Sequence, residues 1–158
     1  MNKQLILSTI AGGKDGLART FSAVPDDKLG WKPLDNGRSA LDLAGEAAQT
    51  PQLLIHVIEL QPGADMPPIG EMFGQMRAQR QSWGKAEVLQ HLEANHAALA
   101  AAIEKLSEED LARSVTLPMG GGMTMPIAGW MMMAYRTYIS RFAQINYIQT
   151  LYGDMDSH

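Results

Sequence analysis

The sequence contains no cysteine among its 158 residues. This absence excludes a disulfide scaffold, a cysteine nucleophile and every thiolate-based metal or iron–sulfur site. A chain without cysteine is compatible with a reducing compartment, and we expect a cytoplasmic protein. The sequence also has no apolar run near the ~20 residues that a membrane helix needs, so we expect no membrane partner.

Positive charge is scarce as well. Lysine and arginine total 13 against 17 aspartate and glutamate residues, which gives a formal net charge of −4 and a pI near 5.5. Because clustered lysine and arginine are needed to bind phosphate backbones, and the chain has no basic run, we expect no nucleic-acid partner. Hydrophobic residues make up 46% of the chain and charged residues only 19%, a composition that can fill a core. The length predicts one domain, spanning residues 1–158.

Helical periodicity dominates what the sequence does contain. Apolar residues recur at steps of three and four, and no segment alternates convincingly between apolar and polar residues as a strand does. The clearest stripe consists of Leu89, Leu92, His96, Leu99, Ile103 and Leu106. Long helices are predicted over residues 3–23, 39–60, 89–106 and 126–152.

Local signals predict where these helices begin, bend and end. Proline disfavours a helix at the residue before it, so the first helix is expected to stop at Val24. Ser39 and Asp42 form a Ser-x-x-acid pattern that favours a helix start. Pro51 lies inside the second helix and predicts a kink or a split there. Gly153 suits the end of the last helix.

The segments between the helices decide the expected topology. Short turns are predicted at residues 26–29 and 107–111, and a glycine–methionine loop at 117–125. A loop at 61–70 and a weakly periodic segment at 71–81 together form a long connection between the second and third helices. This pattern predicts an all-α protein, a four-helix bundle with a long crossover between helices 2 and 3.

A stripe on the last helix combines apolar and polar side chains. Its members are Trp130, Thr137, Arg141, Gln144, Ile148 and Leu151. A core-facing arginine needs a carboxylate or a route to water, because its guanidinium stays charged. Glu46 lies one turn beyond the inward Leu43, and we predict a Glu46–Arg141 ion pair across the bundle centre, with Thr137 or Gln144 completing the hydrogen bonds. The alternative is that both charged groups lie in solvent.

The histidines do not suggest a metal site by themselves. His91 and His96 are five residues apart and therefore point to different helix faces. His96 lies in the leucine stripe, which is typical of a core histidine. Alternatively it lines the same central cavity as Glu46, and it is then the only candidate for a general base.

Two compositional features have structural explanations. The run of residues 12–16, Gly-Gly-Lys-Asp-Gly, lacks the phosphate-loop pattern, and its glycines are expected to permit close approach of another helix, within the bundle or in a dimer. Six of the 11 methionines fall between Met119 and Met133. These flexible thioethers suit a dimer contact or the mouth of an apolar pocket, and plain core filling is an equal alternative.

The order and spacing of several motifs resemble one known family. Arg38-Ser39-x₆-Glu46 is followed, near the end of the chain, by Thr137-x₃-Arg141-x₂-Gln144-x₈-Gly153. A turn with the sequence VPDDKLGWKP occupies residues 24–33, and the sequence LSEEDL occupies residues 106–111. Together these motifs resemble the DinB/YfiT-like superfamily of four-helix bundles over nearly the whole chain.

The resemblance implies a metal centre whose ligands are missing here. Typical members hold a divalent ion with three histidines, and the corresponding positions in this chain are Glu46, Thr137 and Arg141. A carboxylate can bind a metal, a threonine hydroxyl does so poorly, and a guanidinium repels one. We therefore expect no metal and no other cofactor. The resemblance also implies a homodimer.

Three functions remain compatible with the sequence. The favoured one is a DinB-like bundle with a degenerate metal site that binds a small molecule or a second subunit through a central cleft. The cleft residues would be Glu46, His96, Thr137, Arg141 and Gln144. The first alternative is a metal-dependent thiol S-transferase or hydrolase of the DinB-like type, and the second is a structural or interaction module. The missing histidines argue against an enzyme, and no catalytic residue can be assigned.

Overall fold

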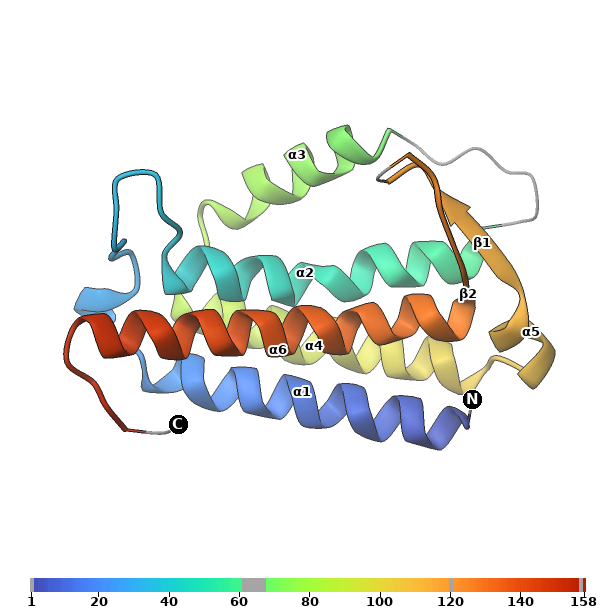
Figure 1. Ribbon diagram of the computed structural model, residues 1–158, viewed down its shortest axis with the longest axis horizontal. Helices are drawn as coiled ribbons and strands as arrows, with labels where there is room; N and C mark the ends of the chain where they lie inside the picture. The colour runs from blue at the N-terminus through green and yellow to red at the C-terminus, as the bar shows by residue number, and fades with distance from the viewer. Residues whose placement is uncertain (1, 61–67, 120, 157) are drawn as a thin grey trace.

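A computed structural model describes residues 2–60, 68–119, 121–156 and 158 of the chain. Four long helices form a bundle, whose arrangement is visible in Figure 1. They are α1 (Lys3–Ala23), α2 (Ala40–Glu59), α4 (Lys85–Glu104) and α6 (Ile127–Leu151). The shorter elements are the 3₁₀ turn η1 (Asp26–Lys28), α3 (Ile69–Arg80), α5 (Glu108–Ala112), β1 (Ser114–Leu117) and β2 (Met123–Pro126).

The bundle has the topology that the sequence predicts. α1 packs against α6 and α4, and α2 packs against α4 and α6, so the four helices surround one core. α3 lies within the connection between α2 and α4 and returns the chain, so that α2 and α4 run in the same direction (Figure 1). No helix among the described residues is long and apolar enough to cross a membrane.

The glycines of α1 permit close contact with α6, as predicted. A Cβ atom on Gly13 would lie 2.8 Å from Cδ2 of Tyr135, and one on Gly16 would lie 3.7 Å from Cδ2 of Phe142. Only a residue without a side chain fits at Gly13 unless the Tyr135 ring moves. The close approach is therefore within the bundle at these two positions.

α2 begins where its cap was predicted and continues through its proline. The side chain of Ser39 accepts a hydrogen bond from the backbone N–H of Asp42 at 3.2 Å. Pro51 lies inside α2, where a kink or a split was predicted, and α2 is one uninterrupted helix, so the split does not occur. Leu54 and Val57, beyond the proline, are buried in the core, and this packing stabilises the second half of the helix.

A β-hairpin was not predicted and is present. β1 and β2 pair antiparallel with Val115 opposite Met125, and residues 117–125, predicted as a loop, supply parts of both strands. Val115 and Leu117 are buried between exposed neighbours, but four residues are too few to reveal alternation in the sequence. Gly121 and Gly122 have φ angles of 88° and 101°, which glycine adopts readily, and they form the turn.

The buried face of α6 is rotated from the predicted one. Trp130 and Ile148 are buried as expected, but Gln144 is exposed and Leu151 is 46% exposed. α6 packs against both α1 and α2, so its buried arc is centred on Tyr138 and neighbouring residues. The polar stripe therefore lies at the edge of the buried arc and not along its middle.

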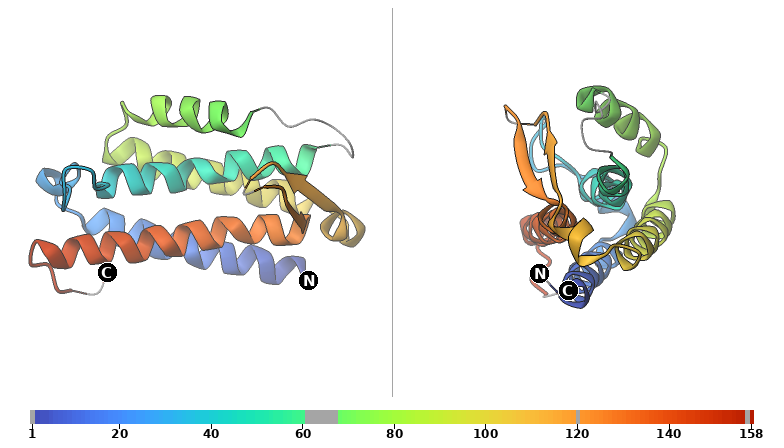
Figure 2. Two further views of the ribbon diagram at one scale, coloured as in Figure 1. Left: turned by 45° about the horizontal axis from the view of Figure 1, so that its top comes forward. Right: turned by 90° about the vertical axis from the view of Figure 1, so that its right-hand side faces the viewer.

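The connection from α2 to α4 covers one side of the bundle. α3 and the hairpin both lie outside the four-helix core, on the side formed by α2 and α6 (Figure 2). The predicted loop at residues 61–70 lies mostly outside the described residues, and residues 71–80 of the weakly periodic segment at 71–81 belong to α3. α3 has no buried residue, which explains why its sequence shows no clear apolar stripe.

Candidate functional site

The predicted ion pair between Glu46 and Arg141 is present. Nη2 of Arg141, on α6, donates to Oε1 of Glu46, on α2, at 2.5 Å. The two side chains are 20% and 33% exposed, respectively, so the pair lies at the edge of the bundle and not at its centre. This position follows from the rotation of α6, and it leaves the pair in contact with water on one side.

Two further arginines extend the pair into an arginine network that consists of Arg38, Asp42, Glu46, Arg80 and Arg141. Arg38 contacts Oε2 of Glu46 and donates through Nε to Asp42 at 2.6 Å. Arg80, on α3, donates through Nε to the other carboxylate oxygen of Asp42 at 3.2 Å. The side chain of Arg80 is only 9% exposed. The network therefore links α3 to α2 and α2 to α6.

The network keeps its two carboxylates ionised. Burial alone would raise the pKa of Glu46, but hydrogen bonds and positive charge from Arg141 and Arg38 hold that pKa below its ordinary value. Burial likewise opposes ionisation of Asp42, and Arg38 and Arg80 lower the pKa of that carboxyl. The pKa of Arg38 is raised, since its two carboxylate partners outweigh its burial.

The remaining stripe residues of α6 take different positions. Gln144 is exposed and accepts a hydrogen bond from Nη1 of Arg141 through Oε1 at 2.8 Å, so it completes the hydrogen bonds of the pair as predicted. Thr137 is half-buried and lines a cavity beside Glu46. Nε of Arg141 is buried and has no hydrogen-bond partner among the described residues.

His96 lies apart from the arginine network. Its ring centroid is 6.2 Å from that of Tyr138, and its Nδ1 is buried without a hydrogen-bond partner in the part of the chain that the structure describes. Burial, and next the charge of Lys14, lowers the pKa of His96. The alternative in which His96 lines a cavity with Glu46 gains no support from the cavity beside Glu46, because none of the described residues that line it comes from α4.

An apolar cavity of about 160 Å³ adjoins the network. Its walls come from α2, α3 and α6, together with Leu117 at the end of β1 and Met119. Its apolar lining consists of Leu53, Leu54, Phe73, Met76, Leu117, Met119, Trp130 and Met133. Its polar lining consists of Glu46, Gln49, Thr50, Arg80 and Thr137. Most of the wall is therefore apolar, and two charged residues, Glu46 and Arg80, contribute to it.

The methionines take two of the roles that the sequence suggested. Met76, Met119 and Met133 line the cavity, which agrees with a pocket mouth made of thioethers. Met131 is fully buried and fills the core. The Trp130 ring is held in place because its Nε1 donates to the backbone carbonyl of Val115 at 2.9 Å.

Sequence reasoning missed the contributions of α3 and of Arg38 to the site. Phe73, Met76 and Arg80 are exposed or half-buried on a helix without an apolar stripe, so periodicity could not assign them an inward direction. The sequence did contain one signal for this site. Arg77 and Arg80 are three residues apart, a spacing that places both on the same face of a helix in a chain with net negative charge. Arg38 is four residues before Asp42 and eight before Glu46, a spacing that suits two contacts along α2.

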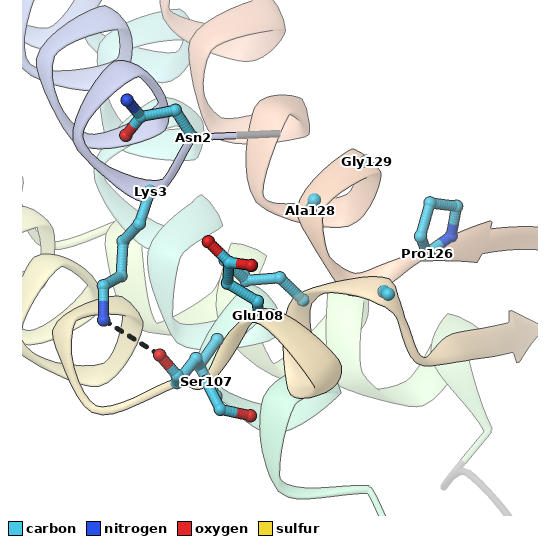
Figure 3. Close-up of a pocket in the computed structure, with 10 residues that line it drawn as sticks. Asn2, Lys3, Ser107, Glu108, Pro126, Ala128 and Gly129 are labelled. Atoms are coloured by element: carbon cyan, nitrogen blue, oxygen red, sulfur yellow. Dashed lines mark hydrogen bonds between the residues drawn. The ribbon is translucent and has the colours of Figure 1, made fainter.

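A larger hollow, of about 990 Å³, lies at the end of the bundle where α1 begins and α4 ends (Figure 3). Pro126, Ala128 and Gly129 form part of its wall and offer few polar groups. Its lysine, Lys3, donates to the backbone carbonyls of Glu104 and Leu106 at 2.8 and 2.9 Å. The Lys3 ammonium already caps the end of α4, so this hollow has fewer polar groups that could bind a ligand than the cavity beside Glu46.

The fold and the site define a class of four-helix bundle in which a polar cluster joins α2 to α6 beneath a crossover helix. Residues 13–136 match the DinB superfamily, and the chain belongs to this superfamily. The resemblance read from the sequence motifs is thereby confirmed.

Solved structures support the same fold. DfsB, described as a sibling lethal factor precursor, has a TM-score of 0.78 at 17% identity, covering 97% of this chain and 98% of its own. YfiT from Bacillus subtilis, described as a probable metal-dependent hydrolase with an unusual four-helix bundle topology, has a TM-score of 0.74 at 12% identity, covering 96% and 87%. These identities show a shared fold alone. A comparison with curated proteins finds no match.

A larger relative contains the same bundle. The mycothiol-dependent maleylpyruvate isomerase has a TM-score of 0.70 at 19% identity, and the match covers 92% of this chain. This chain spans 61% of the isomerase's length. The similarity is therefore limited to the bundle portion of that enzyme.

The residues at the implied metal position do not fit a divalent cation. The Glu46 carboxylate has a guanidinium on each of its two oxygens, from Arg141 and Arg38. Thr137 offers one neutral hydroxyl and Arg141 a fixed positive charge. Among the described residues, no three His, Cys, Asp or Glu side chains are grouped so that they could hold a metal.

Proposed function

We propose that this chain is a binding protein that holds a small molecule in the cavity between α2, α3 and α6. The observation that carries the proposal is the 160 Å³ apolar cavity directly beside the arginine network. An apolar cavity of about 150 Å³ is large enough to hold benzene. A ligand group of that size would bury its apolar surface against Trp130 and the methionines, and polar side chains at one end would orient it.

The proposal includes no metal at Glu46. In this chain, Arg141 supplies the positive charge at that position, and both oxygens of the Glu46 carboxylate are already paired. The binding function therefore uses a permanent cation and needs no metal loading. The expected homodimer stays a prediction. Analytical ultracentrifugation tests it by measuring the molecular mass of the protein in solution.

The cavity can be tested with the neutral probe phenylacetamide and a chain that carries ¹³C-labelled methionine methyl groups. Met119 and Met133 line the cavity, whereas Met155 is exposed near the C-terminus and serves as the reference. Binding in the cavity is expected to shift the signals of Met119 and Met133 and to leave that of Met155 unchanged. An equal shift at all three methyl groups would contradict the proposal, and so would the absence of any shift with phenylacetamide and with its anionic analogues phenylacetate and benzyl phosphate.

A matched pair of variants controls this experiment. Thr137→Phe places a ring into the cavity and is expected to abolish the shifts. Thr150→Phe adds the same ring at an exposed position of α6 away from the cavity and is expected to leave them intact. If the two variants bind phenylacetamide equally well, the probe lies elsewhere.

A further inference from the structure

A second hollow opens beside the apolar cavity. It has a volume of about 460 Å³ and shares Glu46, Phe73 and Arg80 with the cavity. The rest of its lining comes from α3, at Gly70, Gly74 and Arg77. The shared residues make the two spaces neighbours, so a single small molecule can extend from one into the other.

Positive charge is in excess around this second hollow. Four guanidinium groups accompany two carboxylates in the network and its border: Arg38, Arg77, Arg80 and Arg141 against Asp42 and Glu46. The two carboxylates are ionised, so positive charges exceed negative ones by two among these six side chains, although the whole chain has a net charge of −4. A third hollow, of about 420 Å³, adjoins Arg77 and Arg80 and adds Lys32.

Among these four arginines, Arg77 is the one whose guanidinium is not held by a carboxylate of the described residues. It is exposed, lines both the second and third hollows, and has no ion-pair partner among the described residues. Arg80 is nearly buried and is held by Asp42 and Gln49, so its guanidinium has a defined position. One arginine is therefore fixed in place, and the other can adjust to what binds.

The surface of α3 leaves room beside these arginines. Gly70 and Gly74 lie one helical turn apart on the face that lines the second hollow, and a Cβ on either would meet nothing within 4 Å. No side chain from these two positions fills the space next to Arg77. An oxyanion fits there, because arginine binds carboxylate and phosphate with two parallel hydrogen bonds.

We infer that the ligand is a small amphipathic anion, with an apolar group about the size of a benzene ring in the cavity and a carboxylate or phosphate at Arg77 and Arg80. The inference rests on the proposed binding function and assigns the ligand's chemical class. The apolar group contributes burial against Trp130 and the methionines. The oxyanion compensates the excess positive charge of the arginines that line the second hollow.

The test compares three probes that share one aromatic ring. Phenylacetate carries a carboxylate, benzyl phosphate carries a phosphate, and phenylacetamide is neutral. At low ionic strength we expect at least one anion to bind roughly tenfold more tightly than phenylacetamide, with a preference that shrinks as salt is added. The tighter of the two anions identifies the oxyanion. Both anions should shift the methyl signals of Met119 and Met133.

Arg77→Gln provides the decisive variant. It removes one exposed charge, so it is expected to reduce the preference for the anion severalfold and to leave the affinity for phenylacetamide unchanged. Arg19→Gln removes an exposed arginine on α1, away from the hollows, and is expected to change neither affinity.

The outcomes separate this inference from the proposed function. Equal affinity for the anions and the amide overturns the inference and leaves cavity binding standing. An anion preference that Arg77→Gln does not reduce, or anion binding that leaves Met119 and Met133 unshifted, also overturns it. If none of the three probes shifts those methyl signals, the proposed function fails and the inference fails with it.

Discussion

Arg141 and Glu46 are 95 residues apart in the sequence, and Nη2 of Arg141 lies 2.5 Å from Oε1 of Glu46. Arg38 occupies the other oxygen of the same carboxylate. The carboxylate of Glu46, on α2, therefore binds two guanidinium groups. One belongs to Arg141 on α6, and the other belongs to Arg38, the residue just before the N-cap of α2. The position that the family resemblance assigns to a metal ligand serves here as the acceptor of an ion-pair network.

Removing the charge of Glu46 is expected to destabilise the fold. Glu46→Gln leaves Arg141 and Arg38 without their shared carboxylate, and the partial exposure of the pair limits the expected loss to about 1–2 kcal/mol. Chemical denaturation measures the change. Glu104→Gln, at an exposed position of α4, serves as the control and is expected to change stability by less than about 0.5 kcal/mol. A loss no larger than that of the control would show that the pair contributes nothing.

Acid is expected to weaken the fold through the same carboxylates. The pKa values of Asp42 and Glu46 are lowered in the folded chain from ordinary values of 3.8 and 4.5. The unfolded chain therefore binds more protons in this range, so the stabilisation is present above these values and is lost as the pH falls through the folded pKa values. The urea midpoint should fall between about pH 5 and pH 3, and less steeply in Glu46→Gln. If the urea midpoint fell with pH equally steeply in the unsubstituted protein and in Glu46→Gln, this account would be contradicted.

His96 is expected to titrate below its ordinary pKa of 6.5, because burial and the charge of Lys14 disfavour its protonated form. The unfolded chain then binds the proton more readily, so this contribution to stability is lost as the pH falls below about 6.5. Histidine NMR titration measures the pKa directly. Lys14→Gln removes the nearby positive charge while Glu93 and Asp15 remain, so the pKa of His96 should rise. An unchanged or lower pKa in that variant would count against Lys14 as a cause.

Two neighbouring glycines of α1 should respond in opposite directions to alanine. Gly13→Ala places a Cβ 2.8 Å from the Tyr135 ring and is expected to destabilise the fold by about 1–2 kcal/mol. Gly12→Ala meets nothing within 4 Å and should stabilise the helix by about 0.5–1 kcal/mol. Thermal and urea unfolding of both variants measure the difference. Equal effects would show that α1 and α6 are not in the close contact described.

Much of the bundle could be predicted because its signals are local. The cap at Ser39, the end of α1 before Pro25 and the glycine after α6 each depend on a few consecutive residues. The ion pair could be predicted because an inward arginine requires a carboxylate, and Glu46 was the one suitably placed. The hairpin and α3 could not be predicted with the same means, because each strand of the hairpin has only four residues and α3 has no buried residue, so neither carries a long periodic pattern.

The sequence by itself determined the four helices, their order and the charged residues of α2 and α6, because periodicity, caps and charge are properties of the local chain. Only the tertiary structure decided which face of α6 is buried, that the cavity beside Glu46 is lined from α2, α3 and α6, and that α3 brings Arg80 to this cavity and Arg77 to the hollow beside it. These outcomes depend on how helices far apart in the sequence rotate and pack against one another, and packing energy is shared among segments that no local pattern connects.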